Sequence, residues 1–186
     1  MRFKQRSHLA GMHATLSPSS NAWTNYDVDK MEAVYRTQQA AQRGTELHAF
    51  AAEAIRLQIT QEDTGQTLNS YINDAIGFRM VPEQVLFYSE NAFGTADAIN
   101  DRDEYLRIHD LKTGLNEANM RQLETYAAFY CLEYHKNPMK LAGIELRIYQ
   151  NDDIKVVQAD PDEITHIMEH TKLMDEIISR LKVEES

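Results

Sequence analysis

Cysteine is almost absent from the 186-residue sequence, in which Cys131 is the single example. One thiol cannot form a disulfide within the chain or an all-cysteine metal site, and it favours a reducing compartment. No apolar run approaches the roughly 18 residues that a membrane-spanning helix needs. The basic N-terminal segment also lacks the continuous apolar stretch of a secretory signal. We therefore expect a cytoplasmic protein that does not cross a membrane.

Positive charge is also scarce, since 19 lysines and arginines face 29 aspartates and glutamates, for a net charge of −10. Proteins that bind nucleic acids through bulk positive potential need lysine and arginine on the binding face. The composition therefore argues against a tight, autonomous nucleic-acid binder. It leaves open an enzyme that acts on DNA where bound metal ions offset its carboxylates locally.

The length and the hydrophobic periodicity predict one domain with a substantial core. Residues 1–43 form an N-terminal extension whose helix begins at Asp27, and Gly44 is expected to interrupt that helix. The order of the remaining elements predicts a single α/β domain over residues 1–186, with a mixed central sheet flanked by helices. These elements are helices over 45–58, 67–77, 116–135 and 161–182, and strands over 84–89, 94–100, 104–114, 141–150 and 154–158.

The segment 94–114, GTADAINDRDEYLRIHDLKTG, is typical of a β-hairpin because two short β-rich runs flank a polar turn. Asp110 and Lys112 are two residues apart and so share one face of their strand, near the open end where Asp97 also lies. Accessible carboxylate oxygens are suitable ligands for a hard divalent ion such as Mg²⁺. The alternative is a solvated hairpin with charged rims. A turn at 101–103 leaves the two aspartates out of register, so a bulge or a turn displaced toward Glu104 is required.

Three polar residues on helices extend this candidate site. His48 lies at the boundary of the apolar stripe of its helix, where it is either a metal ligand or a core-edge histidine with one hydrogen bond. Gln122 and Tyr126 are spaced i, i+4 and share a helix face that can reach over the same site. Their alternative interpretation is a partly buried tyrosine beside an amide. Glu83 and Glu90 are expected to be solvated.

Four short motifs follow one another along the chain: G-T-E-L-H (44–48), G-T-A-D (94–97), H-D-L-K-T-G (109–114) and Q-L-E-T-Y (122–126). In this order, the sequence resembles the PD-(D/E)XK nuclease superfamily, specifically its RecB-like branch with a Q-x-x-x-Y helix. The preceding L-S-P-S-S segment (16–20) resembles bacteriophage-encoded members. The resemblance covers roughly residues 44–130.

This resemblance implies a restriction-endonuclease-like core and a site for one or two Mg²⁺ or Mn²⁺ ions. His48, Asp97 and Asp110 would bind the metal, with the main-chain carbonyl of Leu111 as a further ligand. Asp110 stands where many relatives have glutamate, which shortens the reach of the carboxylate by one methylene. No iron–sulfur cluster is expected, because the cysteine cluster of the relatives that carry one is missing.

The resemblance also assigns roles in catalysis. Lys112 would orient or help to deprotonate the attacking water and would form the catalytic group together with Asp97 and Asp110. Gln122 and Tyr126 would position the DNA strand.

The function expected from these motifs is a metal-dependent DNA nuclease, more specifically an exonuclease, that acts in phage DNA recombination, repair or replication in the host cytoplasm. No helicase motif is present, so a recombinase or helicase partner would be a separate chain. Two other hypotheses stay open: a decayed or non-catalytic module that binds a partner protein or DNA, and a hydrolase of RNA or nucleotides. The sequence leaves the cleavage mode, strand preference and oligomeric state undecided.

Overall fold

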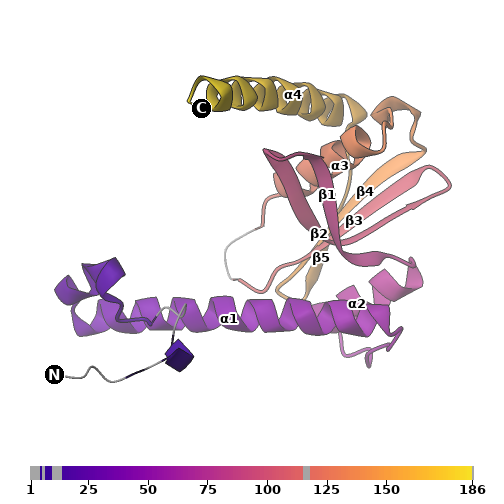
Figure 1. The fold of residues 1–186 in the computed structure, drawn as a ribbon. Coiled ribbons are helices and arrows are strands. Elements are labelled where there is room, and N and C mark those ends of the chain that lie inside the picture. The colour runs from indigo at the N-terminus through magenta and orange to yellow at the C-terminus, as the bar shows by residue number, and fades with distance from the viewer. Residues whose placement is uncertain (1–4, 6, 10–13, 115–117, 186) are drawn as a thin grey trace. The chain divides into compact units, whose positions relative to one another are not determined.

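A five-stranded mixed sheet lies at the centre of the computed structural model, which describes residues 5, 7–9, 14–114 and 118–185 (Figure 1). The strands stand in chain order, and β3 and β4 are parallel whereas the other neighbours are antiparallel. A parallel pair needs a crossover, which helix α3 (Arg121–Glu133) provides. The predicted α/β fold with a mixed sheet and flanking helices is confirmed. The strands are β1 (Val81–Ser89), β2 (Ala92–Arg102), β3 (Tyr105–Leu111), β4 (Gly143–Gln150) and β5 (Asp153–Gln158).

Helices cover both faces of the sheet. On one face α3 packs against the strands, and α4 (Pro161–Glu184) packs on α3. On the other face α2 (Thr67–Gly77) and the last turns of α1 (Val28–Arg56) enclose a second core with Tyr71, Leu111 and Tyr149. The predicted bounds of α2 are confirmed, and α3 begins at Arg121 rather than at 116; residues 115–117 lie outside the described residues. Within the described chain, no helix combines the length and the apolar character that crossing a bilayer requires.

The chain divides into two compact units, Met1–Arg43 and Gly44–Ser186. The first unit contains the 3₁₀ helices Ser7–Leu9 and Pro18–Asn25 and the beginning of α1, and the second contains the sheet. The interruption expected at Gly44 is wrong, because α1 continues through this residue. One glycine costs a helix interior only about 1 kcal/mol. Its missing side chain is also needed here, since a Cβ on the buried Gly44 would lie 2.8 Å from Oγ1 of Thr113.

Two-residue turns fix the register of two hairpins. Asp103 and Glu104 both have positive φ, as the tight turn between β2 and β3 requires, and Asn151 and Asp152 do the same between β4 and β5. The first turn therefore lies one to two residues later than 101–103, as the displacement toward Glu104 anticipated.

A buried polar cluster lies between the sheet and α2. His109 is fully buried, with Nδ1 3.2 Å from the Tyr149 hydroxyl, which donates a hydrogen bond to Asp74 at 2.6 Å. Burial, with a smaller contribution from the positive charges of Arg147 and Arg107, lowers the pKa of His109 to about 3. The folded protein therefore keeps this imidazole neutral, whereas the unfolded chain protonates it below about pH 6.5.

Stability should consequently fall as the pH decreases through this window. Because the folded pKa lies below the unfolded one, His109 lowers the free energy of unfolding by up to about 1.4 kcal/mol per pH unit below pH 6.5. We expect His109→Gln to flatten this dependence. Urea titrations of both proteins from neutral pH to pH 4 measure it, with His166→Gln on the exposed side of α4 as the control. Equal pH slopes in the wild type and His109→Gln would contradict the expectation.

Candidate metal centre

The strand register places three carboxylates in one row across the sheet. Pro82 pairs with Ala98 and Gln84 with Ala96, so Glu83 on β1 lies opposite Asp97 on β2. The pairing of β2 with β3 ends at Ala98 and His109, and its next position places Asp97 opposite Asp110. The sequence prediction contained the second half of this row. The first half was missed.

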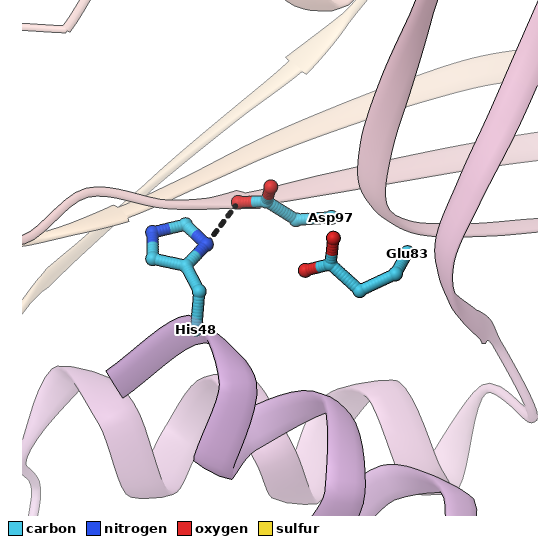
Figure 2. Close-up of side chains that lie close together, drawn as sticks. All are labelled: His48, Glu83 and Asp97. Atoms are coloured by element: carbon cyan, nitrogen blue, oxygen red, sulfur yellow. Dashed lines mark ion pairs between the residues drawn. The ribbon is translucent and has the colours of Figure 1, made fainter. Parts of the chain in front are cut away.

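Helix α1 adds an imidazole to this row. Figure 2 shows His48, Glu83 and Asp97 pointing toward one another, from α1, β1 and β2. One ligand atom of each lies within 4.8 Å of the other two. Nδ1 of His48 is 3.3 Å from Oδ2 of Asp97, which also accepts a hydrogen bond from the main-chain N–H of Leu111 at 2.9 Å. We call His48, Glu83 and Asp97 the metal group.

The chemistry of the metal group fits a divalent cation. One imidazole and two carboxylates are ligands for first-row and alkaline-earth divalent ions. Adjacent ligands of an octahedral ion at about 2.1 Å are about 3 Å apart. The observed 3.3 Å between His48 and Asp97 is compatible with that spacing. The group could therefore hold a metal ion without a large rearrangement.

A second chain of contacts lies beside the metal group. Nζ of Lys112 is 3.1 Å from Oδ1 and 3.0 Å from Oδ2 of Asp110, and it donates a hydrogen bond to Oε1 of Gln122 at 2.9 Å. Nε2 of Gln122 in turn donates to the Tyr126 hydroxyl at 3.2 Å. Tyr126 also packs against Gly94, where a Cβ would lie 3.0 Å from its ring. Residues from the last three sequence motifs thus meet at one place.

The carboxylates of the row repel one another. Burial, followed by the charge of Asp97, raises the pKa of both Asp110 and Glu83. The hydrogen bond with Asp97 raises the pKa of His48 against the opposing effect of burial. Asp110 is only 2% exposed, and its buried Oδ2 makes no hydrogen bond within the described part of the chain, although Lys112 lies nearby. Without a cation, the row holds more negative charge than its surroundings compensate.

Glu83 reaches the metal group through an unusual backbone conformation. Its φ is +54°, in the left-handed region, which costs a residue with a side chain about 1 kcal/mol or more. The alternation of the hairpin also breaks here, since Ala96 packs toward α3 whereas Ala98 packs toward α2. Strained backbone of this kind persists only where the surrounding structure maintains it.

The predicted metal ligands lie in two different sets of contacts. It brings His48 and Asp97 together, whereas Asp110 is bound by Lys112 and is not a member of the metal group. Leu111 contacts Asp97 through its N–H, and a role for its carbonyl stays a prediction. The sequence analysis missed Glu83, which it expected to be solvated. A two-residue turn at 90–91 would by itself place Glu83 opposite Ala98. The irregularity between Phe87 and Ser89 shifts the register by one residue and brings Glu83 opposite Asp97, and no sequence pattern signals this shift.

Lys112 also lines a cavity of about 290 Å³. The cavity is lined by Leu47, Gln66, Thr67, Leu68, Leu111, Lys112, Thr113, Asn151 and Asp152.

Comparisons with known proteins identify no relative: the sequence matches no family model and no curated protein. The chemical interpretation of the site therefore depends on its own geometry.

Replacing Glu83 by glutamine should weaken metal binding and relieve repulsion at the same time. We expect the Glu83→Gln variant to bind Mn²⁺ at least about tenfold more weakly, which corresponds to about 1.4 kcal/mol. In EDTA the variant should be at least as stable as the wild type, because a raised carboxylate pKa means that folding disfavours the charged form at neutral pH. Calorimetric titration and urea unfolding measure the two effects.

Glu176→Gln, on the exposed side of α4, is the matched control for the loss of one charge. Equal Mn²⁺ affinities of the Glu83→Gln and Glu176→Gln variants would exclude Glu83 from the metal group.

Proposed function

We propose that this chain is a Mg²⁺- or Mn²⁺-dependent DNA nuclease of the PD-(D/E)XK type, related to the RecB-like branch with a Q-x-x-x-Y helix. The observation that carries the proposal is the chain of contacts from Asp110 through Lys112 and Gln122 to Tyr126, at 3.1, 2.9 and 3.2 Å, beside the His48–Asp97 pair. Four motifs that lie far apart in the sequence supply neighbouring side chains at one site.

The proposed reaction is the hydrolysis of a phosphodiester. Water attacks phosphorus, the bond from phosphorus to the leaving oxygen breaks, the water loses a proton and the leaving oxygen gains one. A bound divalent ion would lower the pKa of the water and neutralise charge on the phosphate oxygens. His48, Glu83 and Asp97 would hold that ion, and Asp110, opposite Asp97 in the strand register, would add a carboxylate to its surroundings.

Lys112 is suited to act as an oriented donor. An ammonium group has three hydrogens, and Asp110 and Gln122 accept two of them. The remaining hydrogen is available for the attacking water or for a phosphate oxygen. These two acceptors fix the direction of the Lys112 ammonium group, which supports a role in orienting water and stabilising negative charge.

Gln122 and Tyr126 fit a positioning role. Gln122 accepts a hydrogen bond from Lys112 through its carbonyl oxygen, and its amide nitrogen donates one to the Tyr126 hydroxyl, so hydrogen bonds connect the three side chains. The same groups can donate hydrogen bonds to phosphate oxygens of a strand that passes over the site.

The loss of Lys112 should abolish hydrolysis and leave the fold intact. Linear and circular DNA are incubated with Mn²⁺, and the wild type is expected to degrade at least one of them. Lys112→Ala should reduce the rate at least about a hundredfold, as the loss of one preorganised charge-stabilising donor typically does. Thermal unfolding and far-UV circular dichroism check the fold.

Lys155→Ala is the matched control, because Lys155 is an exposed lysine on β5. A Lys112→Ala variant that cleaves DNA at the wild-type rate would contradict the proposed catalytic site. A wild type that binds Mn²⁺ but cleaves neither DNA form would instead indicate a non-catalytic module.

A further inference from the structure

An exposed apolar strip lies on the β1–β2 hairpin, on the side of the sheet that faces away from α3. Leu86 and Ala96 point toward α3 and are buried. Their neighbours on the two strands point the opposite way, and Val85, Phe87 and Phe93 are 49%, 43% and 59% exposed. We call these three residues the aromatic strip.

The two phenylalanines already form a stacked pair. Phe87 and Phe93 are direct cross-strand partners, and their ring centroids are 6.3 Å apart with an interplanar angle of 28°. The hairpin presents this pair as an ordered surface, because both rings are held by paired strands. Aromatic faces of this kind accept further rings by offset stacking. Two large exposed rings side by side also form a larger apolar patch than the single, scattered apolar residues of an ordinary protein surface.

The aromatic strip and the metal group share the same two strands. Glu83 precedes Val85 by two residues on β1, and Asp97 follows Thr95, the partner of Val85, by two residues on β2. Four residues separate Glu83 from Phe87, which corresponds to about 13 Å along a strand. The strip therefore begins beside the metal group and leads away from it.

His48 reaches the metal group from the same side of the sheet. The end of α1 packs on Ala98 and Leu111, in the core that faces away from α3, and this is the side on which the aromatic strip is exposed. A polymer bound at the metal group can thus continue along the hairpin without crossing the sheet.

The charge of the chain limits how a nucleic acid can be bound. The net charge is −10, and Arg56 and Arg121 are paired with carboxylates on their own helices or on α4. The overall negative charge works against binding through phosphate contacts alone, so a further source of affinity is expected. Stacking of bases on aromatic side chains contributes about 1–3 kcal/mol per base and depends little on sequence.

We propose that the aromatic strip binds unpaired bases of a single-stranded segment whose phosphate lies at the metal group. This inference rests on the proposed nuclease function and specifies its substrate class. Single strands are favoured over duplexes because bases inside a duplex are stacked on one another, and exposing them costs a few kcal/mol. Val85 contributes an apolar contact between the metal group and the two rings.

The test uses the Lys112→Ala background with Mn²⁺, in which the oligonucleotide remains uncut. A short oligothymidylate that contains 2-aminopurine reports stacking by fluorescence and affinity by anisotropy. We expect Phe93→Ala to weaken its binding about 5- to 150-fold, equally at low and high salt, because stacking releases no counterions. Phe93→Tyr should restore most of the affinity, and Leu173→Ala, an equally exposed apolar residue on α4, should leave it unchanged.

Two further measurements separate the failure of this inference from the failure of the proposed function. Mn²⁺ affinity of Phe93→Ala checks that the metal group is intact, and wild-type hydrolysis of bis(p-nitrophenyl) phosphate reports the chemistry without bases. Wild-type hydrolysis together with unchanged oligonucleotide affinity in Phe93→Ala would overturn the aromatic strip alone. Absence of hydrolysis of both the small diester and DNA by the wild type would overturn both proposals.

A protein occupant of the strip would give a different pattern. If Phe93→Ala abolished self-association in sedimentation experiments and left oligonucleotide affinity unchanged, the strip would be a contact between copies of the chain, and the proposed single-strand site would be wrong.

Discussion

Repulsion between Asp97 and its two neighbours, Glu83 and Asp110, is the constraint on which the arrangement of this site depends. Two hairpins in fixed register bring these carboxylates side by side, where burial and neighbouring charge raise the pKa of Asp110 and Glu83. Only strongly paired strands can hold like charges together, because flexible loops would relax apart. Lys112 and His48 compensate part of the charge, and a divalent cation would compensate the rest. The site thus destabilises the folded protein, but it favours the binding of a divalent cation.

Helices on the two sides of the sheet supply different residues to the site. On one side, α3 places Gln122 against Lys112 and Tyr126 against Gln122, and Tyr126 also packs on the core beneath α3. On the other, α1 places His48 against Asp97, and the absence of a side chain at Gly44 lets that helix approach Thr113 closely. The pairing of β2 with β3 ends at Ala98 and His109, next to Asp97 and Asp110, and side chains from both sides of the sheet approach this point. This explains why residues so distant in sequence meet there.

Much of the fold follows from periodicity and turn chemistry, since α2 begins and ends at the predicted residues and the five predicted strands form a mixed sheet. Gly44 shows where local propensity fails, because a cost of about 1 kcal/mol is outweighed by tertiary packing. Glu83 shows where alternation fails. A residue with a left-handed backbone inside a strand cannot be recognised from the alternation of apolar and polar residues. Only the strand register, which places Glu83 opposite Asp97, shows that Glu83 belongs to the metal group.

The turn at Asp103 and Glu104 lies at the far end of the hairpin from the carboxylate row, yet its length determines which residues stand opposite one another in that row. Because the pairing runs from this turn to Ala98 and His109, a register shift of one residue would bring Leu111 or His109 opposite Asp97. Such a shift would also move each side chain of the strand to the opposite face of the sheet. The turn between β4 and β5 has the same shape but aligns no charged row. A change in the length of the first loop would therefore disrupt the carboxylate row, whereas a change in the second would disturb the hydrogen bonds between Asp152 and Thr67.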